Sequence, residues 1–444
     1  MFKFLRSIFG GVCTRLMFDQ HAWTTEMAVT GVADIDAAIP EYWAYEILHD
    51  GDRESFWTQL SGKEGSRLPV IDKTGPLKQK GDQLTINTIA QLMGTGVTGE
   101  SVLKGNEELL AAGTLTITCD VVRHAVAVSR KSTKQANFDE VNTAGIQLKD
   151  WMTRKRDNDV FTTILADTTE VIYAGNSNTA VGDLNAVDGD VFGVNEIEMI
   201  RLALIRKGSM PIAVKKQHGR TIPCYGIVFG EVEDYNLSTN TTFVQTVKDA
   251  WDRYKGNNNH PLFEGVIGYY RNMLLYPYYS ILPIPQGTPL RPETIVFATL
   301  TTTATTLSVG GATQATGVTE AYTLFFATSG SLQIADEILS YTGKTVNSFT
   351  GLSRGVSSTT AVQHAPDALV TQRNIASVIG FGAEAVLRAT GEEPEPIGES
   401  DDYGEQIGIG IRAYYGQSLK KDKRLGRANN IVICKVYSQN PGMI

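Results

Sequence analysis

The 444-residue chain contains only four cysteines and six histidines, and both sets are scattered along the sequence. Cys13, Cys119, Cys224 and Cys434 show no paired spacing, so neither a disulfide framework nor a zinc site is predicted. No two histidines have the spacing that places two metal ligands on one helix face. We therefore expect free, buried thiols in a reducing compartment, with no metal ion and no other cofactor.

The sequence also lacks a membrane-spanning apolar run and an excess of positive charge. Its 40 Lys and Arg residues against 48 Asp and Glu residues give a formal net charge of −8. This balance argues against a subunit that coats nucleic acid, although a local basic patch facing DNA is still compatible with it. The N-terminus has the charge and apolar character of a signal peptide but no clear cleavage site, so we predict an amphipathic arm carrying Phe2, Leu5, Phe9 and Val12.

The composition is that of a globular protein, with 42% hydrophobic and 20% charged residues. A chain of this length exceeds what one hydrophobic core usually supports, so two or three packed units are expected.

Two extended runs, Gln83 to Met93 and Thr114 to Arg130, flank a short acidic piece with a helix-like pattern, Gly105-Asn106-Glu107-Glu108. A long amphipathic helix follows, with Asn137 and Glu140 spaced as a capping box. Apolar residues recur at helical spacing: Val141, Ala144, Leu148, Trp151, Met152, Val160, Ile164 and Leu165. The polar stretch Thr153 to Asp159 predicts an exposed or interfacial face.

This order of segments resembles the major capsid protein family of N-four-like tailed phages. The resemblance implies an α+β fold of the Hong Kong ninety-seven type, with an N-terminal arm, an extended β-hairpin loop, a long spine helix, and peripheral and axial domains. It implies a non-enzymatic subunit that assembles in the host bacterial cytoplasm into pentamers and hexamers of an icosahedral virion shell around double-stranded DNA. The implied partners are further copies of the chain, portal, scaffold and decoration proteins, and DNA contacted non-specifically, with no membrane.

The same resemblance suggests a division of the chain. The expected ranges are an arm and linker at 1–65, the extended loop at 66–100, a peripheral domain at 101–180 with its spine helix at about 137–166, an axial domain at 181–296 and 376–400, an inserted all-β domain at 297–375, and closing peripheral strands at 401–444.

Further elements follow from local pattern. Helices are predicted over 196–207, with Asn195 as cap and Gly208 as stop, and over 242–254; strands are predicted over 222–230 and 265–279. The Thr-, Ser- and Gly-rich stretch 297–373 predicts an immunoglobulin-like or similar small β module, and we expect it to decorate the exterior. The next residues, 374–391, have apolar positions at helical spacing and predict a return to helix.

Two sets of charged residues are candidates for contacts. Lys78, Lys80 and Asp82 at the start of the extended loop could pair with Glu107 or Glu108 of a neighbouring subunit, and Arg123 is a candidate inter-subunit ion-pair partner. Its neighbour His124 is expected to be a satisfied structural residue.

A basic turn is formed by Lys420, Lys421, Lys423 and Arg424. Such a turn is usually exposed to solvent and has no binding role. The alternative hypothesis is that it contacts DNA or an acidic neighbouring subunit.

Three motifs point to other functions. Gly94–Gly99 matches a dinucleotide fingerprint, which leaves a nicotinamide-dependent oxidoreductase as one alternative, although its preceding run alternates like a half-exposed hairpin. Gly351–Gly355 matches a nucleophile elbow, but the chain order of His364 and Asp367 is wrong for that fold. The β module by itself favours a second alternative, a tail or adhesion subunit of a virion.

Overall fold

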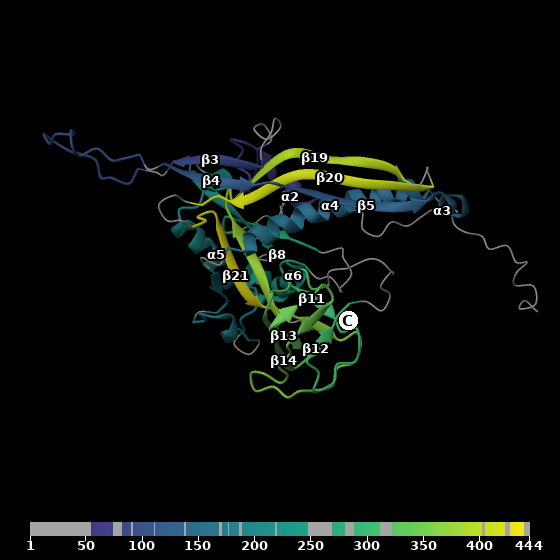
Figure 1. Cartoon of the computed structure of the whole chain (residues 1–444). Coiled ribbons are helices and arrows are strands. Elements are labelled where there is room, and N and C mark those ends of the chain that lie inside the picture. Colours follow the sequence, from purple (N-terminus) through teal and green to yellow (C-terminus); the bar gives the residue numbers. More distant parts are fainter. Residues whose placement is uncertain are drawn as a thin grey trace, which may run out of the picture. The chain divides into compact units, whose positions relative to one another are not determined.

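A computed structural model describes residues 55–73, 82–89, 92–110, 112–136, 139–167, 171–175, 177–185, 189–217, 220–246, 269–279, 288–310, 322–401, 405–421 and 427–438 (Figure 1). The predicted N-terminal arm, including Cys13, lies outside the described residues, as does Asn137 of the predicted capping box. His49–Lys134 together with Glu140–Ile444 form one compact unit, which carries the elements below. None of the helices in the described part of the chain has the length and apolar character needed to cross a membrane.

A five-stranded sheet has the order β1-β2-β19-β20-β5. Its strands are β1 (Ser61–Lys63), β2 (Val70–Lys73), β19 (Val386–Asp401), β20 (Gln406–Leu419) and β5 (Asp120–Ser129). The two longest, β19 and β20, pair antiparallel, and β20 pairs antiparallel with β5 (Figure 1). Because β2 pairs only with Val386–Ala389, the rest of β19 is a sheet edge, where prolines are tolerated: Pro394 lies in a register shift, and Pro396 pairs with Ile411.

The predicted long helix is confirmed as α4 (Glu140–Leu165), which runs alongside β20 and β5 (Figure 1). Its Leu148 and Met152 pack against Ile411, Ala413 and Tyr415 of β20. This packing explains the helical spacing of its apolar residues, since one face must cover the sheet.

The expectation that Thr153 to Asp159 is exposed is wrong at Asp157, which is 1% exposed. Its carboxylate accepts hydrogen bonds from Ser55 Oγ at 2.6 Å and from the backbone N–H of Phe56 at 2.9 Å. These donors belong to the start of the short helix α2 (Phe56–Gln59), so the buried charge is satisfied at a helix N-terminus.

The second sheet has the order β6-β21-β18-β8-β10-β9, with β7 also paired to β8. Its strands are β6 (Val171–Tyr173), β21 (Ile431–Tyr437), β18 (Ile375–Phe381), β8 (Arg220–Phe229), β10 (Met273–Pro277), β9 (Tyr269–Tyr270) and β7 (Ala213–Gln217). The associated helices are α5 (Val194–Arg206), α6 (Glu231–Thr239) and the 3-10 turn η4 (Val181–Asp183). One core joins apolar residues of α5 to β8, β10, β18 and β21.

Several predicted elements are confirmed here and others are corrected. The helix over 196–207 and the strand over 222–230 are α5 and β8, and Gly208 has the positive φ of a helix stop, but the N-cap of α5 is Gly193, not Asn195. The strand expected over 265–279 is instead the hairpin of β9 and β10. Of the helix expected over 242–254, residues 241–246 are helical and the rest lies outside the described residues.

The helix predicted over 374–391 is wrong. This segment forms β18 and the start of β19, and every residue of β18 is buried. Strands β21 and β8 flank β18, and α5 lies so close that a Cβ added at Gly380 would stand 2.2 Å from Ile200 Cγ2. A strand covered on both faces is apolar throughout, so its pattern does not distinguish it from a buried helix.

Over the stretch predicted as an all-β module, the described residues form seven short strands in two sheets, β11-β17-β13-β14 and β12-β16-β15. They are β11 (Glu293–Ile295), β12 (Thr306–Ser308), β13 (Gly330–Ile334), β14 (Glu337–Tyr341), β15 (Gly343–Lys344), β16 (Ser348–Thr350) and β17 (Leu369–Thr371). The module has its own core, and its first and last strands pair with each other. It follows β10 and precedes β18, both strands of the second sheet, so it is an insertion.

Candidate assembly surfaces

The extended hairpin comprises residues 82–119. Strands β3 (Gln83–Ile89) and β4 (Ala112–Thr118) pair antiparallel from Gln83 opposite Thr118 to Ile89 opposite Ala112, so a hairpin forms here. The run predicted as extended from Thr114 to Arg130 is divided between β4 and β5, and only β4 belongs to this hairpin. The tip segment, residues 92–110, is irregular, so the helix-like reading of Gly105 to Glu108 is wrong.

The tip segment exposes an unusual number of large apolar side chains. Met93 is 76% and Leu109 is 88% exposed, and the other exposed members in this part of the hairpin are Ile89, Leu92, Val102, Leu103 and Leu110. Large apolar side chains that gather in one exposed segment in this way indicate an interaction site. The tip is therefore the first candidate surface for contact with another chain.

The two predicted acidic residues of the tip hold the tip itself together. Glu108 accepts hydrogen bonds from the N–H groups of Met93 at 2.9 Å and Gly94 at 2.5 Å, and Glu107 accepts one from Gly105 at 2.7 Å. Gly94 allows this approach, because a Cβ there would lie 2.7 Å from Glu108 Oε2. Their proposed partners Lys78 and Lys80 lie outside the described residues, so pairing across subunits stays a prediction.

The root of the hairpin is anchored to the five-stranded sheet. Leu84 and Ile117 share a small core with Ile71 and Leu387, and Cys119 donates its N–H to the Asp82 carbonyl at 2.9 Å. Asp82 thus acts here through its backbone. Cys119, Cys224 and Cys434 are free and buried, as predicted.

Substitution of Gly416 tests this anchorage. A Cβ on Gly416 would stand 2.1 Å from the backbone oxygen of Thr118, so Gly416→Ala forces β20 and β4 apart. We expect a loss of about 2 kcal/mol in the free energy of unfolding, measured by chemical denaturation. The matched control is Gly398→Ala in β19, where no atom lies within 4 Å of the added Cβ. Equal stability of the two variants would contradict the close packing at the root.

A buried polar network fixes α4 on the sheet. Arg388 of β19 makes a bidentate ion pair with Asp72 of β2, with distances of 2.5 and 2.9 Å. On the helix, Arg156 lies 3.6 Å from Glu393, and burial followed by the nearby Arg388 charge lowers its pKa. Burial and the Asp159 carboxylate raise the pKa of Tyr415, whose hydroxyl donates to Asp159 at 2.7 Å.

A cleft of about 610 Å³ opens beside this network, between α4 and the edge of the long sheet. Its apolar lining comes from Leu148 and Met152 of α4 and from Pro394, Pro396 and Ile411 of the sheet. The lining is also polar in part and includes Lys149, Arg156 and Glu393. The cleft is the second candidate surface, because its apolar part matches the character of the tip segment.

Arg123 and His124 lie on the exposed part of β5. Arg123 stands opposite Arg412 in the strand register, and Arg412 pairs with Glu392 and Glu395 of its own chain. No intrachain ion pair of Arg123 occurs among the described residues, which leaves it available to another chain. His124 is exposed, and its ring lies 4.7 Å from that of Trp151; its structural role stays a prediction.

Of the predicted basic turn, Lys420 and Lys421 are described and Lys423 and Arg424 are not. Lys420 forms an ion pair with Glu384, whereas Lys421 is exposed.

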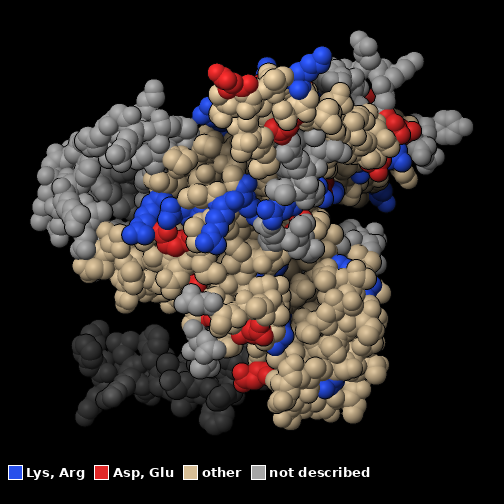
Figure 2. Space-filling view, turned by 90° about the vertical axis from the view of Figure 1, so that its left-hand side faces the viewer, with Lys and Arg blue, Asp and Glu red and all other residues tan. Residues whose placement is uncertain are grey.

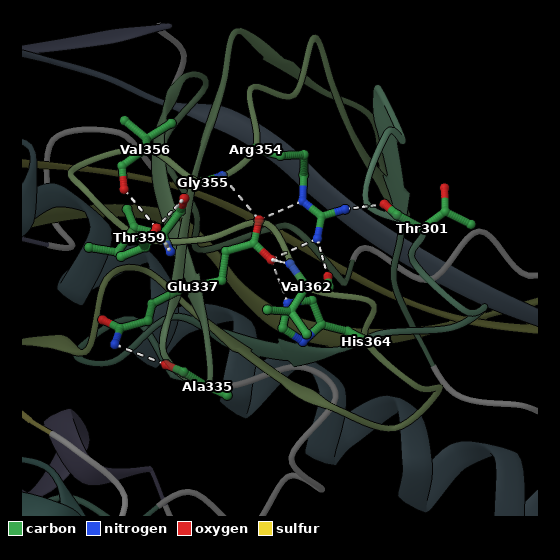
Figure 3. A network of polar contacts seen from close by, with 11 residues as sticks. Thr301, Ala335, Glu337, Arg354, Gly355, Val356, Thr359, Val362 and His364 are labelled. Carbon is green, nitrogen blue, oxygen red and sulfur yellow. Dashed lines mark hydrogen bonds and ion pairs between the residues drawn. The ribbon is translucent and has the colours of Figure 1, made fainter.

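The module contains the most heavily bonded carboxylate in the described part of the chain, Glu337 on β14 (Figure 3). It is 2% exposed, and Arg354 donates to both of its oxygens at 2.7 Å. His364 Nε2 lies 2.8 Å away, and the N–H groups of Gly355 and Val362 donate at 3.1 and 3.0 Å. Burial would raise the pKa of Glu337, but these hydrogen bonds outweigh it and hold the pKa at about 2.

This network replaces the nucleophile-elbow reading. Gly351 and Gly355 have positive φ angles and shape a turn, and Ser353 exchanges backbone hydrogen bonds with Ser340. Sequence analysis missed Glu337, Asp157 and Arg388, although a lone charged residue inside an apolar strand, as in EILSY or VLRAT, is a usable signal of a buried ion pair.

The structure contradicts the dinucleotide reading as well. Gly94–Gly99 lies in the exposed tip segment, and the described residues 95–110 form no helix. Among the residues that the structure describes, no group of three or more His, Cys, Asp or Glu side chains is arranged to hold a metal ion.

Comparisons with known proteins give matches to phage capsid proteins. Residues 63–191 match the family model "Phage capsid protein", whereas curated protein sequences give no match. The structure is similar to the capsid of Ralstonia phage GP4, with 15% identity and a TM-score of 0.58 over 94% of this chain and 100% of that one.

Two other solved structures are comparably similar. The cyanophage Pam1 capsid has 14% identity and a TM-score of 0.62 over 93% of this chain and 100% of that one. The head of Helicobacter pylori bacteriophage KHP40 has 15% identity and a TM-score of 0.63 over 93% of this chain and 99% of that one. At such identities the likeness establishes the fold.

Proposed function

We propose that this chain, which has the α+β fold of Hong Kong ninety-seven-like phage capsid proteins, is the major capsid protein of a tailed-phage head. The similarity over nearly the full length of solved capsid chains carries the proposal. The role is structural and not catalytic, and its place is the virion capsid shell.

The finer proposal concerns the assembly. Copies form pentamers and hexamers of an icosahedral shell around double-stranded DNA, assembled in the host cytoplasm with portal, scaffold and decoration proteins. The exposed apolar tip segment supports self-association, since burying such side chains against a second copy is favourable by about 25 cal/mol per Å². The apolar cleft beside α4 is the receiving surface that we propose. Membership of the N-four-like group and the peripheral and axial ranges given above remain predictions.

Exposed charged residues are expected to add ion pairs between neighbouring subunits. Arg123 is exposed on β5 without an intrachain ion pair among the described residues, which suits it for a neighbouring subunit. A single exposed pair contributes only about 0 to 1 kcal/mol, so shell stability depends on many repeated contacts.

Electron microscopy of the purified chain, with sedimentation velocity across a range of salt concentrations, tests the proposed function. We expect rings or closed shells of uniform size. A salt-stable monomer or dimer that does not assemble even with scaffold and portal present would overturn the proposal.

Removal of the module tests its proposed role as an exterior decoration. Glu293 and Thr371 are partners in the antiparallel pair of β11 and β17, so residues 294–370 can be replaced by a two-residue Asn-Gly turn. The body keeps its own cores, and we expect shells of normal size in electron micrographs. A folded deletion variant that makes no shells would show that the module joins neighbouring subunits.

The alternative of a tail or adhesion subunit rests on the module alone. The module is one insertion, and the chain around it has the capsid fold. The oxidoreductase alternative loses its support because its glycine motif lies in the tip segment.

A further inference from the structure

Four segments that are distant in sequence meet at the C-terminal end of α5. Lys207 Nζ donates to the Ile431 carbonyl at 2.8 Å, and the Met210 N–H donates to Asn430 Oδ1 at 3.0 Å. The Ala383 N–H donates to the Met210 carbonyl, and the Lys420 N–H donates to the Ala385 carbonyl. Residues 206–212, 382–385, 420–421 and 427–431 are therefore neighbours.

This meeting point concentrates positive charge. We define the basic surface as Arg206, Lys207, Lys420, Lys421 and Arg427, and Glu384 is the sole acid in the four segments. Figure 2 shows a band of Lys and Arg side chains across the face of the molecule that carries α5. The surface joins Lys420 and Lys421 of the predicted turn to Arg206, Lys207 and Arg427, in a chain whose formal net charge is −8.

Not all of these charges are neutralised within the chain. Lys420 pairs with Glu384, and Lys207 is bonded to a backbone carbonyl. Arg206 and Lys421 are exposed and make no ion pair among the described residues. Their long side chains carry their charge into solvent, where an anion reaches them.

The acidic clusters of a second copy match this surface poorly. Glu392 and Glu395 on β19 pair with Arg412, and Glu393 pairs with Arg156. The tip residues Glu107 and Glu108 bond the N–H groups of their own loop. Phosphate, in contrast, is an anion that repeats along the DNA backbone and that both Lys and Arg side chains bind.

We propose that the basic surface contacts the phosphates of double-stranded DNA enclosed by the shell. This inference rests on the proposed function and adds the residues that make the contact. The expected binding is independent of base sequence, because contacts to phosphates carry no sequence information. It weakens steeply with salt, since each phosphate contact releases a condensed counterion.

The test compares two double variants of the full chain, as unassembled subunits, for binding to labelled short duplex DNA over a range of salt concentrations. The first is Arg206→Gln with Lys421→Gln. The matched control is Lys131→Gln with Lys134→Gln, two exposed lysines on α3 (Arg130–Gln135), which follows the far end of β5. We expect the first variant to bind about 10- to 100-fold more weakly at low salt and to lose about 2 units of the log–log salt slope, with the control unchanged.

Shell formation by each variant is followed by electron microscopy. Equal DNA affinity of the two double variants, or no DNA binding by the unsubstituted chain, would overturn the inference. So would a first variant that binds DNA normally but no longer forms shells, since the surface would then be a contact between copies. A failure of the unsubstituted chain to form shells would count against the proposed function alone.

Discussion

Removing the apolar character of the hairpin tip is expected to abolish shells while leaving a folded subunit. The variant carries Met93→Gln, Leu103→Gln and Leu109→Gln. These side chains are exposed and belong to no core of the described chain, so their loss leaves the free energy of unfolding almost unchanged. Every contact between copies loses apolar burial worth about 1.5 to 3 kcal/mol per side chain, and the loss is repeated around the whole shell. Sedimentation velocity should show subunits only.

The matched control changes exposed polar residues of the same segment, Thr95→Gln and Thr98→Gln. The control should assemble normally, because it removes little apolar surface. Normal shells from the apolar triple variant would show that the tip is not an assembly surface. Loss of shells from both variants would point instead to the conformation of the tip.

Neutralising Glu337 is expected to destabilise the module strongly. In Glu337→Gln the shape is kept, but the Arg354 guanidinium, which is buried in the network of Figure 3, loses its counter-charge. Breaking a buried pair in this way is destabilising by about 3 to 5 kcal/mol. Hydrogen exchange should show early opening of β13 and β14 with the body unaffected, because the module has a core of its own. The adjacent Asp336→Asn, at an exposed position, is the control; comparable opening in both variants would refute the role of the pair.

The same carboxylate predicts an acid-sensitive module. Its pKa is about 2 in the folded chain against an ordinary value of 4.5, so ionised Glu337 favours the folded state. The ionised carboxylate contributes about 3 kcal/mol to the free energy of unfolding of the module. This contribution is complete above pH 4.5 and is lost as the pH falls towards 2. The stability of the module in Glu337→Gln should lack this dependence over that range.

The elements that can be predicted from the sequence are those with one buried and one exposed face, because such elements have a periodic hydrophobic pattern. The alternation in β3 and the helical spacing in α4 each arise from an element with one buried side, and both were predicted. The alternation of β18 is absent because it is covered on both sides, and this is why it was misread as helix. The acidic run Gly105 to Glu108 was misread for another reason: its carboxylates bond loop N–H groups and do not cap a helix.

The polar contacts were harder to predict than the elements. Asp157 contacts residues about 100 positions away, and Arg388 pairs with Asp72 across 316 positions. These partners are brought together by the tertiary packing of α4 and β19, which cannot be read from the local sequence pattern. The basic turn is recognisable in the sequence as a run of positive charges. Its proximity to Arg206 and Lys207 is not, because it depends on the tertiary contact between the end of α5 and the start of β21.

The pairing of the module's first and last strands has a consequence for what this lattice can carry. Glu293 and Thr371 are strand partners, about 5 Å apart, which is the separation that many small domains offer between their own termini. The rest of the subunit is therefore joined to the inserted domain at two neighbouring points of the chain, whatever domain is inserted there. If the module lies on the exterior, as proposed, a foreign domain or antigen with neighbouring termini in its place would be displayed once per subunit over the whole shell, at a spacing set by the lattice.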